Sequence, residues 1–273
     1  MNLAQASKYF DRIQVVDPFT GARLFLAQVE PYDDTKRDAY SAYRRILSVA
    51  PGTKIPTHRS VRLLGMDWIV GAGEADGMQE LHRQKYVLSQ ASATLKVSTL
   101  AQYLQGQFSA SVKAAPYWSK DAKQIDTSSE QPQLFDVFVS SSVVAQNILW
   151  DGTQAYLCTS ARPMASGLLS AFSLKLTHSL EPAILRLRTY DPVVGGYTVN
   201  SSPAVNALRV RWQSLFEYTS QAEVRYQEGD LSVVLPAAPV VNTSALVQFP
   251  DATYQVLSVE TVGGAQVAHC RKV

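Results

Sequence analysis

The sequence is poor in the residues that most often carry metal binding, redox chemistry or covalent cross-links. It has only two cysteines and four histidines in 273 residues. Cys158 and Cys270 are far apart and have no metal-ligand spacing around them, so we expect two free, buried thiols and folding in a reducing compartment. The histidines form no HExxH, HxH or CxxH arrangement. The sequence therefore predicts no metal site and no cofactor.

The common catalytic and nucleotide-binding motifs are also missing. There is no Gly-x-Ser-x-Gly elbow, no Walker loop and no GxGxxG,. Two carboxylates can serve a glycosidase, but most aspartates of this chain stand where turn formation itself favours Asp. These are Asp17, Asp67, Asp151, Asp191 and Asp251. We expect no enzyme activity; the alternative is a hydrolase whose site is assembled from scattered Asp and His residues.

Charge is scarce and balanced in sign. Charged residues make up 18% of the chain, and 25 Lys and Arg against 23 Asp and Glu leave a net charge of +2. Such a balance creates no overall field that would attract nucleic acid or an anionic membrane. No uncharged run reaches the roughly 20 apolar residues of a membrane span, and the N-terminal residues do not resemble a signal peptide. We expect a soluble chain with no membrane partner.

The sequence contains one turn motif, Asp-Pro-x-x-Gly, at two distant positions. The stretches "DRIQVVDPFTG" (11–21) and "LRLRTYDPVVG" (185–195) both run from an alternating strand into Asp-Pro-x-x-Gly. In this turn proline fixes φ near −65°, glycine supplies a positive φ, and Asp bonds the backbone that follows it. Each copy is followed by a strand that ends at proline, "LSVAP" and "LSVVLP",. Each copy then continues into a hairpin pattern, at 60–74 and at 245–260.

Landmarks that recur in one order predict an internal duplication. We expect a mainly β protein built from duplicated antiparallel β-barrel or sandwich modules, with little helix. The expected division is a first β module at 10–95, a β-rich middle region at 96–183 and a second β module at 184–273 that repeats the first.

The middle region shows weaker signals. "NILWDGTQAYLCTSA" (147–161) predicts a hairpin with Asp-Gly at its turn. "STLAQYLQG" (98–106) predicts a short helix with Ser98 as the N-cap. The polar stretch at 119–133 predicts an exposed loop that could reach a partner.

A group of basic residues is a candidate interaction surface. Arg59, Arg62, His82, Arg83 and Lys85 fall in one part of the chain and could line a contact with DNA or with an acidic protein,. The alternative is that they are ordinary solvated charges, with Arg62 covering one face of a hairpin.

An aromatic pair is a second candidate surface. Tyr117 and Trp118 follow Pro116 in a loop-like stretch, where a side chain with one apolar face can stack on a sugar or pack against a protein. This pair supports an alternative function, a carbohydrate-binding or adhesin-type β module.

The repeated pattern resembles the small β-barrels of neck and tail proteins of tailed bacteriophages, which include head-to-tail adaptors, head-closure and tail-completion proteins. The stretch 47–73, "LSVAPGTKIPTHRSVRLLGMDWIVGAG", carries the resemblance, and 231–259 carries it more loosely. About half the chain is covered. The resemblance implies a structural component of a phage virion, a ring-forming connector, neck or tail protein that joins head and tail.

The resemblance also implies partners and a location. We expect a cyclic homo-oligomer in contact with neighbouring virion proteins, such as the portal or adaptor and the tail proteins, with DNA passing through the lumen of the ring. The chain would fold in the host bacterial cytoplasm and end in the virion. Strand edges and extended loops would make the contacts, because main-chain pairing between neighbours supplies affinity.

Overall fold

The structure, a computed structural model, describes residues 13–31, 44–50, 53, 55, 59–73, 84–117, 133–137, 143–163, 169–211 and 229–273. Within these ranges 64% of the chain is β-strand and a single short helix is present, so the prediction of a mainly β protein is confirmed. Of the loop expected at 119–133, only Gln133 is described, and it begins a strand.

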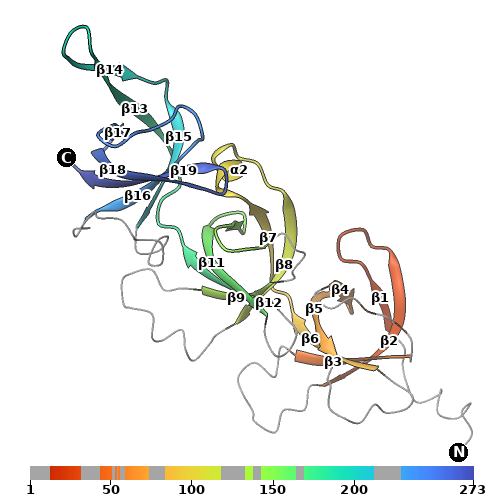
Figure 1. Ribbon diagram of the computed structural model, residues 1–273. Helices are drawn as coiled ribbons and strands as arrows, with labels where there is room; N and C mark the ends of the chain where they lie inside the picture. The colour runs from red at the N-terminus through yellow and green to blue at the C-terminus, as the bar shows by residue number, and fades with distance from the viewer. Residues whose placement is uncertain are drawn as a thin grey trace, which may run out of the picture.

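Three β modules follow one another along the chain and lie in an oblique row (Figure 1). The first module is a closed barrel with strand order β1-β2-β3-β6-β5-β4. Its strands are β1 (Ile13–Val16), β2 (Arg23–Pro31), β3 (Arg44–Val49), β4 (Ser60–Leu63), β5 (Met66–Gly73) and β6 (Gln84–Gln90).

The second module is also a closed barrel, with strand order β10-β11-β12-β9-β8-β7. Its elements are β7 (Ala93–Ser98), α2 (Leu100–Leu104), β8 (Ala110–Tyr117), β9 (Gln133–Val137), β10 (Ile148–Trp150), β11 (Ala155–Pro163) and β12 (Leu169–Lys175).

The third module is a curled sheet with strand order β14-β13-β15-β16-β19-β18-β17, in which β13 pairs also with β17. This extra pairing joins six strands in a ring and leaves β14 outside it. The strands are β13 (Leu180–Asp191), β14 (Gly196–Ser201), β15 (Val205–Arg211), β16 (Leu231–Leu235), β17 (Leu246–Gln248), β18 (Thr253–Val262) and β19 (Ala265–Lys272).

All three modules share one strand order. With β14 set aside, each has six strands that pair in the order first, second, third, sixth, fifth, fourth, and the fourth returns to the first. The expected duplication is therefore part of a threefold repetition that includes the middle region. The expected boundaries at 95/96 and 183/184 fall inside β7 and β13, because the modules are joined by very short links.

Each module has an apolar interior built by strand alternation. In the first module the predicted hairpin places Val61, Leu63, Trp68 and Val70 in one buried cluster, and Val61 pairs with Trp68 across β4 and β5. Both cysteines lie in such interiors as free thiols, as the sequence predicts. Burial raises the pKa of the Cys158 thiol to about 12.

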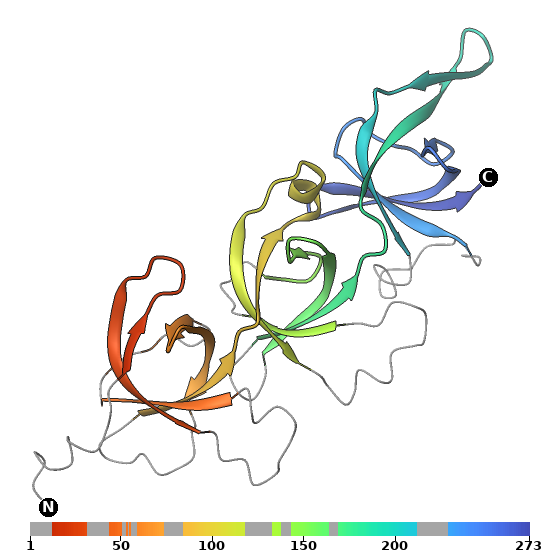
Figure 2. The same cartoon turned by 180° about the vertical axis from the view of Figure 1, so that it is seen from behind.

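The link between the first and second strands, here called the first connection, differs most among the modules. In the first module it is the Asp17 turn, with Gly21 at φ 71°. In the second it contains α2, and in the third it is the extended hairpin of β13 and β14. The three first connections lie at the same side of the row (Figure 2).

The helix predicted at 98–106 is present but begins one residue later than expected. Ser98 is the last residue of β7 and pairs with Ile148, so it belongs to the barrel wall. Thr99 is the N-cap: its side chain accepts from the backbone N–H of Gln102, whose side chain accepts in return from the N–H of Thr99. This capping box stabilises a helix of only five residues,.

Candidate interaction surfaces

The two described arginines of the predicted basic surface lie at the end of the first module and form ion pairs there. Arg59 Nη2 lies 3.2 Å from Asp17 Oδ2. Arg62 Nε lies 2.6 Å from Asp67 Oδ1, the residue paired with it across the β4–β5 hairpin. Each arginine therefore has an acidic partner within its own module.

The other predicted site residues are not brought to these arginines in the described part of the chain. Lys85 lies on β6, two strands away from β4, and pairs with Ser48 of β3. His82, Arg83 and Trp118 fall outside the described residues. Tyr117 ends β8, and only its backbone is described. The DNA-contact and sugar-stacking hypotheses therefore stay predictions.

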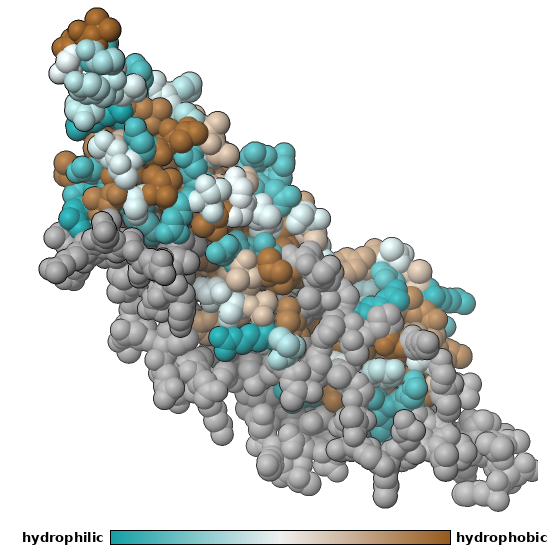
Figure 3. Space-filling view, in the orientation of Figure 1, coloured by the Kyte–Doolittle hydropathy of each residue, from teal (hydrophilic) through white to brown (hydrophobic). Residues whose placement is uncertain are grey.

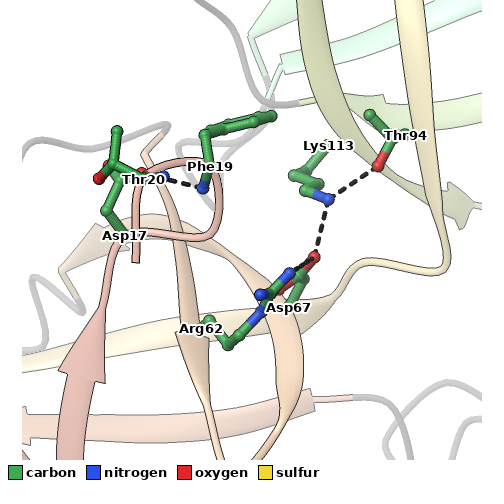
Figure 4. A network of polar contacts seen from close by, with 7 residues as sticks. All are labelled: Asp17, Phe19, Thr20, Arg62, Asp67, Thr94 and Lys113. Atoms are coloured by element: carbon green, nitrogen blue, oxygen red, sulfur yellow. Dashed lines mark hydrogen bonds and ion pairs between the residues drawn. The ribbon is translucent and has the colours of Figure 1, made fainter. Parts of the chain in front are cut away.

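Asp67 connects the first module to the second. Its Oδ2 lies 2.8 Å from Nζ of Lys113 on β8, and the Lys113 side chain is only 11% exposed. The same ammonium donates to Oγ1 of Thr94 at 2.7 Å and lies 5.3 Å from the ring centre of Phe19 (Figure 4). Burial alone would raise the pKa of Asp67, but Arg62 and Lys113 together hold it below its usual value.

Backbone and apolar contacts complete this first junction. The link between β6 and β7 is only Ala91 and Ser92, and the N–H of Ala91 donates to the carbonyl of Asp67. Ile69 on β5 packs with Ala115 on β8 and with Ala91. The first module thus contacts the second through its first connection and its fifth strand, and the second module receives it on its second strand.

The second junction is larger and apolar, and it uses the same parts. Leu100, Tyr103 and Leu104 of α2 belong to one buried cluster with Leu208 and Val210 of β15. The cluster also contains, from the second module, Ile148, Ala155, Leu157 and Leu176, and from the third, Val234, Ala265 and Val267. The first connection and fifth strand of the second module therefore meet the second strand of the third.

A hydrogen bond and a close backbone approach fix the helix at this junction. Asn206 on β15 donates from Nδ2 to the carbonyl of Leu104 at 3.0 Å. Gly264, at φ 78° in the turn between β18 and β19, lies against Ala101 of α2: a β-carbon there would be 3.5 Å from Cβ of Ala101.

The third module also has a first connection and a fifth strand at its outer end, but no described module packs against them. The β13–β14 hairpin extends beyond the row and carries exposed apolar side chains near its tip (Figures 1 and 3). Val193 and Val194 in the turn are 92% and 75% exposed. Tyr190 and Tyr197 pair across the two strands with ring centres 5.5 Å apart, and both are more than half exposed.

Within the described ranges, no three His, Cys, Asp or Glu side chains are grouped so that they could hold a metal ion. The helix that these ranges contain is too short to span a membrane.

Comparison of the chain with protein-family models, with curated proteins and with solved structures gave no match in any of the three.

The two junctions and the hairpin tip were not predicted as interaction surfaces from the sequence. The junctions depend on residues that look like ordinary outward strand positions until the next module is placed beside them. One signal was present for the hairpin: "DPVVGG" puts two valines in the middle of a turn, where polar residues are the norm.

Proposed function

We propose that this chain is a structural subunit of a tailed-phage virion, a ring-forming connector, neck or tail protein that joins head and tail. The observation that carries the proposal is a row of two closed barrels and a curled sheet, whose β13–β14 hairpin exposes apolar side chains at the end of the row. A closed barrel has no free strand edge along its wall, so its connections and the outward faces of its strands are the parts available for specific contacts. In this protein these parts already make the contacts between modules.

The arrangement suits a mechanical role. Each junction holds its neighbours through several different contacts, which are an ion pair, a short link and packed side chains at the first, and a shared apolar core at the second. A subunit of this kind binds copies of itself and neighbouring virion proteins, such as the portal or adaptor and the tail proteins, and catalyses no reaction. DNA would pass through the lumen of the assembled ring.

The test is genetic. A nonsense codon placed in the gene within its native genome should give lysates in which electron microscopy shows DNA-filled heads and detached tails. Expression of the intact chain from a plasmid should restore joined particles, and mass spectrometry should detect the chain in them. Normal tailed particles that lack the chain would overturn the proposal.

A further inference from the structure

The two junctions inside the chain are made by residues at equivalent strand positions. On the second strand of each module a buried alanine has the same place: Ala27, Ala114 and Ala207 are at most 2% exposed and face the interior of their own module. Since side chains alternate along a strand, the residue before each alanine faces outward.

The outward residue contacts the preceding module at both junctions. Lys113 precedes Ala114 and pairs with Asp67 of the first module. Asn206 precedes Ala207 and bonds to the carbonyl of Leu104 in the second module. The equivalent residue of the first module is Leu26, which is half exposed on β2.

The fifth strand gives the matching positions on the other side of each junction. Trp68 and Tyr156 face the interiors of their modules and occupy equivalent hairpin registers, opposite Val61 and Leu149. The residue after each one packs into the junction, Ile69 in the first module and Leu157 in the second.

In the third module the interior residue is Tyr254, opposite Val247, and the residue after it is Gln255. Gln255 is exposed. The first and second modules each contact the following module through a first connection and an outward position on the fifth strand. The outer end of the third module presents both of these parts.

We propose that the β13–β14 hairpin and the Gln255 face of one copy pack against the outer face of β2 around Leu26 in the first module of a second copy, so that copies join head to tail. The inference rests on the proposed function in one respect: both assume that copies of the chain assemble with one another. The apolar hairpin tip and the exposed Leu26 then bury each other as the internal junctions do. Two different faces meet, so the contact is heterologous and closes into a ring or continues as a filament.

Sedimentation velocity over a range of concentrations tests the contact with paired variants. The wild-type chain should form oligomers. The double variant Val193→Asp and Val194→Asp should abolish them, because it places two charges in the apolar contact, and Leu26→Asp should do the same on the other face. Val240→Asp and Leu64→Asp are matched controls, since these side chains are 76% and 66% exposed and lie outside the proposed contact; both should leave the oligomers intact.

Mixing distinguishes a heterologous contact from any symmetric one. The hairpin variant keeps its Leu26 face, and Leu26→Asp keeps its hairpin, so an equimolar mixture should contain a dimer that neither variant forms alone. Circular dichroism and thermal denaturation of each variant should show a folded chain. Oligomers that survive both variants, or a mixture that stays monomeric, would overturn the proposal.

Cross-linking checks the orientation. A mixture of Gln255→Cys and Leu26→Cys chains should give a covalent dimer with a short bismaleimide, while each chain alone should not. The native Cys158 and Cys270 are fully buried and do not compete for the reagent. A mixture of Val240→Cys and Leu26→Cys is the control and should stay uncoupled. Equal coupling in both mixtures would overturn the proposed orientation.

The outcomes separate this inference from the proposed function. Head-to-tail oligomers of a chain that is dispensable for particle assembly would keep the contact and remove the virion role. Detached heads and tails without the chain, together with a wild-type chain that stays monomeric in solution, would keep the virion role and remove the contact. Retention of the hairpin on lipid vesicles, with no oligomers, would assign the apolar tip to a membrane and also overturn the inference.

Discussion

Asp67 shows how a single side chain connects two modules of this protein. Its carboxylate accepts from Arg62 in its own hairpin and from Lys113 in the next barrel, and it is mostly buried with Lys113. A carboxylate buried in this way depends on both partners, because removing either one leaves the desolvated charge with one compensating cation instead of two. The junction should therefore respond to changes at this one residue.

Replacement of Asp67 by Asn tests this. We expect Asp67→Asn to lower the free energy of unfolding by about 1–3 kcal/mol at neutral pH, since Lys113 is left partly buried without its charged partner. Burial opposes ionisation of Asp67, but its two cationic partners outweigh burial and lower its pKa on folding. The stabilisation is then complete above the unfolded pKa of about 4 and is lost as pH falls through the lower folded pKa.

Urea denaturation of both chains at pH 7 and at pH 3 measures the effect. The difference between wild type and Asp67→Asn should be larger at pH 7 than at pH 3. Glu260→Gln on β18, away from the junction, serves as the control. A difference that is equal at the two pH values would show that the charge of Asp67 does not stabilise the junction.

The two thiols give a second test at the scale of single residues. Burial raises the pKa of the Cys158 thiol to about 12 and also raises that of Cys270. Because the thiolate is the reactive form, neither thiol should react with an aromatic disulfide reagent at pH 8 in the folded chain. Both should react at once in guanidinium chloride. Rapid reaction of either cysteine in the native protein would contradict its placement in the interior of its module.

At the scale of elements, the repeated Asp-Pro-x-x-Gly turn has two different settings. Asp17 accepts from the N–H groups of Phe19 and Thr20 and also pairs with Arg59. Among the described residues, the Asp191 carboxylate accepts only from the N–H of Val193, at the tip of the long hairpin. The same five-residue pattern therefore forms a short link between two barrel strands in the first module and the tip of a long hairpin in the third.

The two turns should differ in their contribution to stability. Asp17→Ala should lower the free energy of unfolding by about 1 kcal/mol, the usual contribution of a side-chain hydrogen bond, because it removes two such bonds and an ion pair at a partly exposed site. Asp191→Ala should lower it by less. The pair forms its own control in urea denaturation, and an Asp191→Ala effect equal to or larger than that of Asp17→Ala would contradict the assignment.

The turns also show what the sequence could and could not predict. Hairpins were predictable because alternation and turn residues are local signals: Val61 opposite Trp68 and the Asp151 turn are both where the pattern places them. The middle barrel was not recognised as a repeat, because its first connection is α2 instead of an Asp-Pro turn. Its similarity to the other two modules lies in the order of strand pairing, which depends on contacts between residues far apart in the sequence.

The interaction surfaces were less predictable than the fold. Arg59 and Arg62 were predicted to lie on a surface, and the structure places both beside aspartates. Asp67 lies opposite Arg62 in the same hairpin, whereas no local pattern connects Arg59 to Asp17. Lys113 and Asn206 carry no sequence signal, since their roles arise only when a second module lies against an outward strand position.

At the scale of the whole molecule, the two junctions differ in strength. The second and third modules share a single cluster of twelve buried apolar residues. In the described part of the chain, the buried apolar cluster of the first junction contains only Ile69 and Ala115, beside the ion pair. Cooperative unfolding follows shared buried surface, so we expect the second and third modules to unfold together and the first to unfold separately.

Leu208→Ala and Leu47→Ala test this coupling as a matched pair, because both side chains are 0% exposed. Leu208 lies in the shared cluster and Leu47 in the interior of the first module. Each change should cost about 2–5 kcal/mol. Hydrogen exchange followed by mass spectrometry should show that Leu208→Ala speeds exchange in 93–175 and 180–272 alike and spares 13–90, whereas Leu47→Ala should affect 13–90 alone. If Leu208→Ala destabilised only 180–272, the second and third modules would be independent folding units. The shared cluster would then be a contact between two separately folded modules instead of a common core.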